Sequence, residues 1–198
     1  MSTQGTRKLT PLGSRRLHKQ RHVGVPVLAP VPLAGYPPEV GLALWSLEDA
    51  RARTLGYLNG TGDAVVNWTP TSQRYGIGTL LYHIVVFEMD WLFADLLGEP
   101  LPPEVEAVLP YDLLAADGSY TMVVDESLAV HVARMERTRS ILLGALRTMS
   151  EEDFQRLREF DTPASPRWIV HHLAQHEAEH RGQIWEVRVA AERHLATG

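Results

Sequence analysis

The segment 165–194 constrains the fold more than any other part of the sequence, because it reads as one long amphipathic helix. Pro166 suits the first position of a helix, where a missing N–H costs nothing. At about 100° per residue, with His176 set at 0°, His180 falls at about 40° and His172 at about −40°. The apolar residues on the same side are Ile169, Leu173, Val187 and Ala191. This helix therefore carries histidines on the face that must be buried.

The histidines on this face need partners, because burying an imidazole is costly unless its nitrogens are satisfied. One metal ion would satisfy several of them, and His176 and His180, one helical turn apart, can bind the same ion. The alternative is a set of core histidines that form hydrogen bonds with backbone groups or acids. Three histidines on one inward stripe favour the metal site.

Another helix must supply a third ligand, because a helical pair leaves the ion under-coordinated. His83 is the best candidate, since it lies midway along the helix predicted over 74–97 and shares a face with Leu80 and Phe87. His131, near the start of the following helix, is the competing candidate. Three neutral histidines leave a position open for water, which is typical of reactive rather than structural metal sites.

Polar side chains near the predicted ligands could support the chemistry. They are Glu88, Asp90, Glu177 and Gln183. Asp90, two turns from His83, could orient a ligand or bind substrate, or it could be an exposed or ion-paired acid. Glu177 could act as a general base on a bound water, or it could form a salt bridge.

Two known metal motifs are partly matched and are rejected. HEAEH at 176–180 fits the H-E-x-x-H zinc protease pattern, but the extended form needs Gly and His where Gln183 and Glu186 stand. Only 18 residues follow His180, which leaves little room for a downstream ligand. A di-iron bundle needs two Glu-x-x-His motifs, and only the one beginning at Glu177 is present.

Three more helices are predicted from apolar periodicity and from start and stop signals, over 39–59, 74–97 and 125–149. Asp125 is a good N-cap for the last of these, and Ser150 is expected to cap a short turn after it. The sequence therefore predicts an all-α fold, a four-helix bundle.

A long link, 98–124, joins the second and third helices and can cross from one end of the bundle to the other. Its centre, 113–124 around Asp117-Gly118, predicts a small hairpin. Within the last helix, Gly182 costs roughly 1 kcal/mol relative to alanine, so we expect another helix to approach closely there.

Residues 1–36 differ from the rest of the chain. They hold six Lys and Arg and no acid, and they are rich in proline. We expect a disordered or extended leader here and one helical domain over 37–198. The whole chain carries a net charge of −5, so its body is acidic, which argues against nucleic acid as the main partner.

The chain has no cysteine, which excludes disulfides, thiolate zinc sites and cysteine nucleophiles. No apolar run approaches the roughly 20 residues of a membrane-spanning helix. Both features fit a cytoplasmic protein without a membrane partner.

Three segments resemble the DinB-like family (the DinB/YfiT superfamily) of helical bundle proteins. The last helix contains WIVHHLAQHEAEHRGQI, with the family's histidine pair followed by Arg-Gly-Gln. The second contains IGTLLYHIVVFEMDWL, and the first contains YPPEVGLALWSLEDARART. The resemblance covers about 36–195. The last helix starts Ser-Pro-Arg-Trp where the family usually has Thr-Pro-Glu-Trp, which changes a surface charge and none of the candidate ligands.

The resemblance implies a bundle in up-down-down-up order that holds one divalent metal ion per chain with His83, His176 and His180. Zinc or nickel is the expected metal, manganese and iron are alternatives, and a water completes the shell. It also implies that His172 supports the ligands rather than binding the metal. Family members include S-transferases and isomerases that use low-molecular-weight thiols.

Three functions follow as hypotheses. The leading one is a metal-dependent transferase that activates a small thiol, with Glu88, Asp90, Gln183 and Glu177 moving protons or positioning substrate. The second is a metal-dependent hydrolase in which Glu177 or another acid is the base. The third is a non-catalytic bundle that its metal stabilises, with a stress-related binding role. Bundles of this kind often pair through a helix face, so we expect a homodimer.

Overall fold

Four long helices form the body of the protein in the computed structural model, which describes residues 29–71, 75–159 and 163–197. They are α1 (Pro38–Leu58), α3 (Ile77–Asp90), α5 (Leu128–Leu146) and α7 (Pro166–Thr197). Three short helices lie in the connections: α2 (Asp63–Val66), α4 (Pro103–Glu106) and α6 (Glu151–Gln155). α3 continues directly into a π-helical segment, η1 (Trp91–Leu97). The prediction of an all-α bundle is confirmed.

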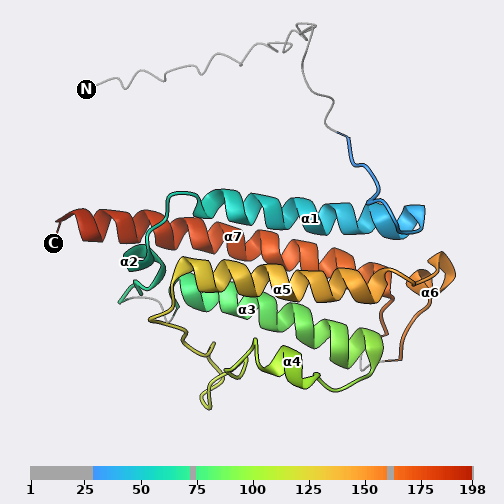
Figure 1. Cartoon of the computed structure of the whole chain (residues 1–198). Helices are drawn as coiled ribbons and strands as arrows, with labels where there is room; N and C mark the ends of the chain where they lie inside the picture. Colours follow the sequence, from blue (N-terminus) through green and yellow to red (C-terminus); the bar gives the residue numbers. More distant parts are fainter. Residues whose placement is uncertain (1–28, 72–74, 160–162, 198) are drawn as a thin grey trace, which may run out of the picture.

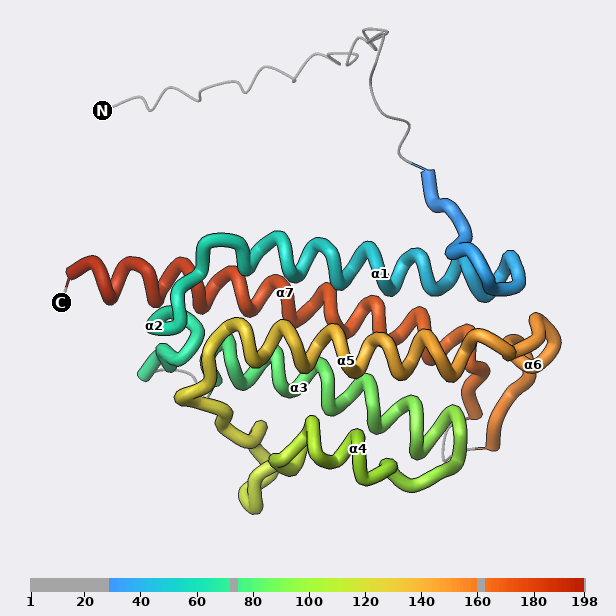
Figure 2. The backbone as a smooth tube through the Cα atoms, in the orientation of Figure 1, coloured from blue at the N-terminus to red at the C-terminus, as the bar shows by residue number. Residues whose placement is uncertain are grey.

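α1 and α7 run in one direction, and α3 and α5 run in the other (Figures 1 and 2). Contacts at both ends support this arrangement. Arg167 at the start of α7 pairs with Glu39 at the start of α1 at 2.6 Å. Towards the other end, Arg188 of α7 donates to the carbonyl of Tyr57 of α1. The link after α3 leads back to the end where α3 began, so α5 can run parallel to α3.

The crossover link, 98–124, contains α4 and a small hairpin. Leu114 and Tyr120 form an antiparallel bridge, and Gly118 makes the turn between them with a φ of 78°. This left-handed backbone conformation favours glycine, because a residue with a Cβ would be strained in it. The predicted hairpin is therefore present, reduced to a single bridge.

Helix starts follow the sequence signals with one correction. Ser150 caps α6 as predicted, and its hydroxyl accepts a hydrogen bond from the N–H of Asp153 at 3.1 Å. α5 begins later than expected, and its N-cap is Ser127, whose hydroxyl lies 3.3 Å from the Val130 N–H. Asp125 is not the cap. It adopts a φ of 64°, a left-handed conformation that a short polar residue tolerates, at the end of the link.

Close backbone approach occurs at Gly41 and not at Gly182. A Cβ on Gly182 would meet no atom within 4 Å, so the expectation of a helix packed against it is wrong. A Cβ on Gly41 would lie 2.8 Å from the carbonyl oxygen of Leu33. The N–H of Leu33 also donates to the Gly41 carbonyl at 3.1 Å, which fixes the described end of the leader against α1. The rest of the predicted leader, 1–28, lies outside the described residues.

Two arginines and two glutamates form a buried ionic cluster, which we call the charge quartet. Each long helix contributes one member: Arg51 from α1, Glu88 from α3, Arg139 from α5 and Glu177 from α7. Each arginine bridges both glutamates. Arg51 lies 3.1 Å from Glu88 and 2.9 Å from Glu177, and Arg139 lies 2.7 Å and 3.0 Å from the same two carboxylates.

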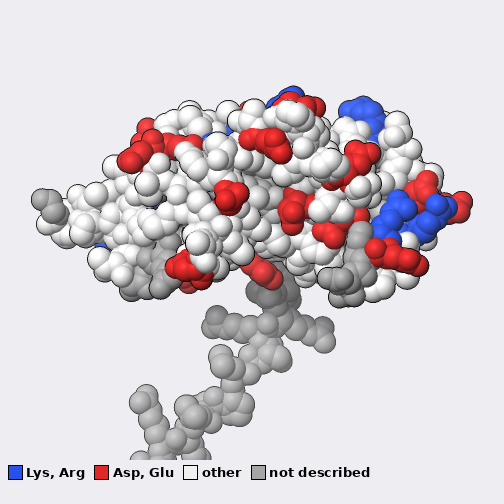
Figure 3. All heavy atoms as spheres, turned by 90° about the horizontal axis from the view of Figure 1, so that it is seen from below, with Lys and Arg blue, Asp and Glu red and all other residues white. Residues whose placement is uncertain are grey.

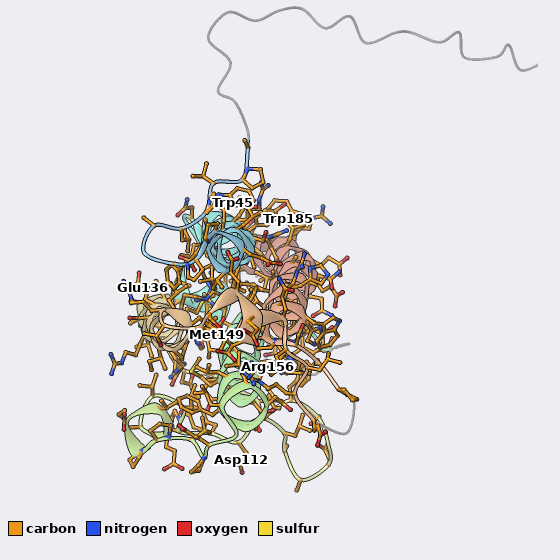
Figure 4. All side chains as sticks on the ribbon, turned by 90° about the vertical axis from the view of Figure 1, so that its right-hand side faces the viewer. Trp45, Asp112, Glu136, Met149, Arg156 and Trp185 are labelled. Carbon is orange, nitrogen blue, oxygen red and sulfur yellow. The ribbon has the colours of Figure 1, made fainter. Side chains whose placement is uncertain are left out.

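The charge quartet is also bonded to the backbone of neighbouring helices. Arg51 donates to the carbonyl of Met135 at 2.6 Å, and Arg139 donates to that of Leu47 at 3.0 Å. Burial alone would raise the pKa of Glu88, but the charges of Arg139 and Arg51 outweigh it and hold that pKa below its ordinary value. Figure 4 shows the side chains between the four long helices from one end of the bundle.

The side of the molecule that carries the crossover link is acidic. No Lys or Arg occurs between residues 75 and 133, a stretch that holds ten Asp and Glu. Figure 3 views this side and shows red groups spread over most of it, with blue groups at its margin. Among the described residues, no helix combines the length and apolar character that crossing a bilayer requires.

Replacing Arg139 by methionine should lower the free energy of unfolding by roughly 3–5 kcal/mol, because two buried carboxylates would then share one arginine. Urea denaturation of the purified variant measures this loss. The matched control is Arg53→Met, which breaks an exposed pair with Asp49 of 2.7 Å and should cost far less than the buried change. Equal losses for the two variants would show that the charge quartet does not hold the helices together.

Candidate metal centre

Three histidines meet between α3 and α7. The Nε2 atom of His176 lies 3.0 Å from the Nε2 atom of His83 and 3.0 Å from that of His180. His83 comes from the middle of α3, and the other two lie one turn apart on α7. His83 and His180 are each 6% exposed. The structure thus brings together the three residues that the sequence indicates as ligands, in a group that could hold a metal ion.

The hydrogen-bond distances in this group fit a shared cation. The Nδ1 atom of His180 lies 2.7 Å from the side-chain carbonyl oxygen of Gln183, which can only accept a hydrogen bond. Nδ1 is therefore the nitrogen that carries the proton, and Nε2 carries a lone pair. A proton on the Nε2 atom of His176 could serve only one of its two neighbours. Two nitrogens bound tetrahedrally to one zinc ion at 2.0–2.1 Å are about 3.3–3.4 Å apart, a few tenths of an ångström more than the observed 3.0 Å.

Burial keeps the three imidazoles neutral. It lowers the pKa of His83 to about 4 and that of His176 to about 3, and it also lowers the pKa of His180. At neutral pH their nitrogens are therefore free of added protons and available to a metal. The Nδ1 atom of His83 is buried and has no hydrogen-bond partner among the described residues. This ring therefore makes its polar contacts only through Nε2.

Aromatic rings cover the histidine group. Phe87 stacks on His176 with ring centroids 3.9 Å apart, and Tyr120 stacks on His83 at 4.0 Å. Phe87 follows His83 by one turn of α3, but Tyr120 arrives from the hairpin of the crossover link. Sequence reasoning did not find Tyr120, because the link has no periodicity that would indicate which side chains turn inward.

His172 lies one turn before His176 and outside the group of three. Its ring stacks on Trp168 at 4.8 Å and meets Trp91 edge-on at 5.2 Å. Its centroid is 6.3 Å from that of His176, with Phe87 touching both rings. His172 therefore belongs to the surroundings of the candidate ligands.

The three acidic residues predicted near the site lie in different surroundings. Glu88 and Glu177 are members of the charge quartet, where their carboxylates bind Arg51 and Arg139. This arrangement agrees with the alternative that Glu177 forms a salt bridge. Both of its carboxylate oxygens accept from arginines, so neither is available for base catalysis. Asp90 lies on the exposed surface at the end of α3, where partial desolvation of its carboxyl raises its pKa.

The sequence did contain a signal for the arginines of the charge quartet. Arg51 falls at helical spacing between buried Leu44, Leu47 and Leu58, on the apolar stripe of α1. A charged residue on such a stripe indicates a buried ion pair. Arg139 occupies a similar place on α5.

His131, the competing third ligand, lies elsewhere. It packs against Gly78, where an added Cβ would lie 2.9 Å from its Nε2 atom. That nitrogen is 3.6 Å from the carboxylate of Glu126, which is too far for a hydrogen bond. Burial lowers the pKa of His131 to about 4, although Glu126 opposes the shift.

Stability should therefore fall as the pH drops from about 6.5 to about 4, because the unfolded chain protonates His131 while the folded protein keeps it neutral. The loss is at most about 1.4 kcal/mol per pH unit for this residue. Unfolding free energies of the wild type and of His131→Gln over this range measure it, since the other histidines cancel in the difference. Identical pH profiles for the two proteins would contradict a neutral buried His131.

The fold is thus a four-helix bundle in which α3 and α7 bring three histidines into a group that could hold a metal ion. The chain belongs to the DinB superfamily, whose family model matches residues 46–184. No curated protein matches the chain significantly. A crystal structure described as a conserved protein from Enterococcus faecalis is similar, with a TM-score of 0.58 and 16% identity, over 74% of this chain and 93% of that one. At that identity the likeness shows the fold.

Proposed function

We propose that this protein is a divalent-metal-dependent enzyme that transfers the sulfur of a low-molecular-weight thiol to an electrophilic carbon. The observation that carries the proposal is the convergence of three neutral imidazoles in a chain of the DinB superfamily, with the Nε2 atom of His176 3.0 Å from those of His83 and His180. Three protein ligands leave a position for an exogenous group, as in catalytic rather than structural sites.

Each residue of the centre has a separate task. His83, His176 and His180 would hold the ion, and Gln183 fixes the tautomer of His180 by accepting from its Nδ1–H. Phe87 and Tyr120 cover the imidazole faces and exclude water from them. A bound divalent cation would lower the pKa of a thiol and so supply a nucleophile near neutral pH.

The transfer itself balances without any redox partner. A bond forms between the thiol sulfur and the electrophilic carbon, the bond from that carbon to its leaving group breaks, and the thiol proton passes to a base. His172 is suited to accept this proton, because burial lowers its pKa and keeps it neutral, and it lies one turn from His176. Imidazole donors favour zinc or nickel over manganese, which prefers oxygen ligands.

The hydrolase alternative has less support. Its base was to be Glu177, whose two oxygens accept from Arg51 at 2.9 Å and from Arg139 at 3.0 Å. Moving this carboxylate to the site would leave two buried arginines short of a partner, at a cost of several kcal/mol. A non-catalytic bundle that the metal only stabilises would share the site but not the activity, so an activity assay separates it from the transferase.

Metal-loaded wild-type protein should conjugate monochlorobimane with at least one thiol from a panel of low-molecular-weight thiols. His180→Ala should reduce the rate to that of the reaction without enzyme, because two histidines hold a catalytic metal poorly. The increase in bimane fluorescence measures the rate, and chelation followed by metal return should abolish and restore it. The matched control is His171→Ala, an exposed histidine of the same helix, which should keep the wild-type rate. Absence of metal-dependent conjugation with every thiol would contradict the transferase.

A further inference from the structure

A pocket of about 360 Å³ opens beside the start of α7, at the end of the bundle where α3 passes into η1. Among the residues that the structure describes, those that line it carry no charged side chain. They are Trp91, Leu157, Pro163, Ala164, Ser165 and Trp168. Trp168 is 47% exposed and Leu157 is 66% exposed, so the mouth of the pocket keeps large apolar groups in water. Such an arrangement is typical of a binding site rather than of a packed core.

Two tryptophans shape the pocket. The ring centroids of Trp91 and Trp168 are 5.7 Å apart and the planes are inclined by 54°, so the two rings form two walls of one corner. His172 stacks on Trp168 with an angle of 13° between the planes, which holds the orientation of that indole. The corner is therefore rigid and aromatic, and it suits a flat ring better than a flexible chain.

The aromatic contacts continue from this corner to the candidate metal centre. Trp91 touches Phe87 at 6.0 Å, and Phe87 stacks on His176 at 3.9 Å. Trp168 precedes His176 by two turns, roughly 12 Å along the helix axis. A molecule anchored by a ring in the pocket could reach the centre with a substituent that passes His172.

We propose that the pocket lined by Trp91 and Trp168 binds an uncharged planar aromatic group of the electrophilic substrate. The inference rests on the transferase function proposed above, for which it names the substrate class. A volume of about 360 Å³ lies near the lower end for small-molecule sites and accommodates a bicyclic ring. The described lining offers no charged side chain that would offset the desolvation of an anionic or cationic group, so it favours an uncharged ring.

Binding of 2-naphthol to the metal-stripped wild type tests this pocket without requiring metal, thiol or turnover. Isothermal titration calorimetry should show one site per chain. Trp168→Ala should weaken binding at least roughly tenfold, because a stacking wall is removed, whereas Trp168→Phe should retain most of it. A saturated bicyclic alcohol of similar volume should bind at least about fivefold more weakly than 2-naphthol.

The matched control is Trp185→Ala. Trp185 is on the same helix, is 49% exposed, and lies on the α1 side, where it contacts Tyr57 (Figure 4). Its removal should leave the Kd unchanged. Three results would contradict the proposed aromatic site. They are equal weakening by Trp168→Ala and Trp185→Ala, absence of naphthol binding, and equal affinity for the saturated alcohol. Failure of conjugation with Trp168-dependent binding intact would refute the transferase alone and leave the aromatic site standing.

Discussion

The pairing of four buried charges sets the register of the whole bundle. Arg51, Glu88, Arg139 and Glu177 come one from each long helix, and each arginine must meet both carboxylates. A slip of one turn by any helix would leave a buried charge without its partner, which is far more costly than a displaced apolar contact. Apolar packing makes the bundle stable, and the charge quartet specifies which of the neighbouring packings the chain adopts.

That register also determines where the histidines lie. Glu177 directly follows His176, and Glu88 directly follows Phe87, whose ring stacks on His176. When the two glutamates meet the same pair of arginines, α3 and α7 are aligned so that His83 faces the histidine pair. The charge quartet and the candidate metal centre are therefore two consequences of one alignment. We expect changes in the first to alter the second.

Periodicity predicted the parts of the structure that repeat. The helix over 165–194 and its inward histidines follow from the 3.6-residue period, whereas the choice of His83 and the supporting role of His172 also rest on the family resemblance. The structure brings His83, His176 and His180 together. Periodicity could not predict the features of the structure that depend on a single contact or turn in the crossover link. Tyr120 reaches His83 only because the link folds back, and Ser127 takes the cap because Asp125 turns left-handed two residues earlier.

The sequence also could not predict whether Glu177 acts as a general base or forms an ion pair. Glu177 stands beside a candidate ligand and has the spacing of a general base, yet its carboxylate binds two arginines from other helices. Spacing along one helix shows which residues share a face, but not which charges the other helices bring to it. Arg51 carried a signal on the apolar stripe of α1, without a sign of which acid it would meet.

The proposed function depends on the binding of one divalent metal ion by His83, His176 and His180. Metal content by mass spectrometry, on protein purified without a histidine tag and loaded with zinc or nickel, tests it most directly. We expect about one ion per chain for the wild type and for His131→Gln, and less than about a tenth for His83→Ala and His176→Ala. Full occupancy in His83→Ala, or loss of the ion in His131→Gln, would contradict it.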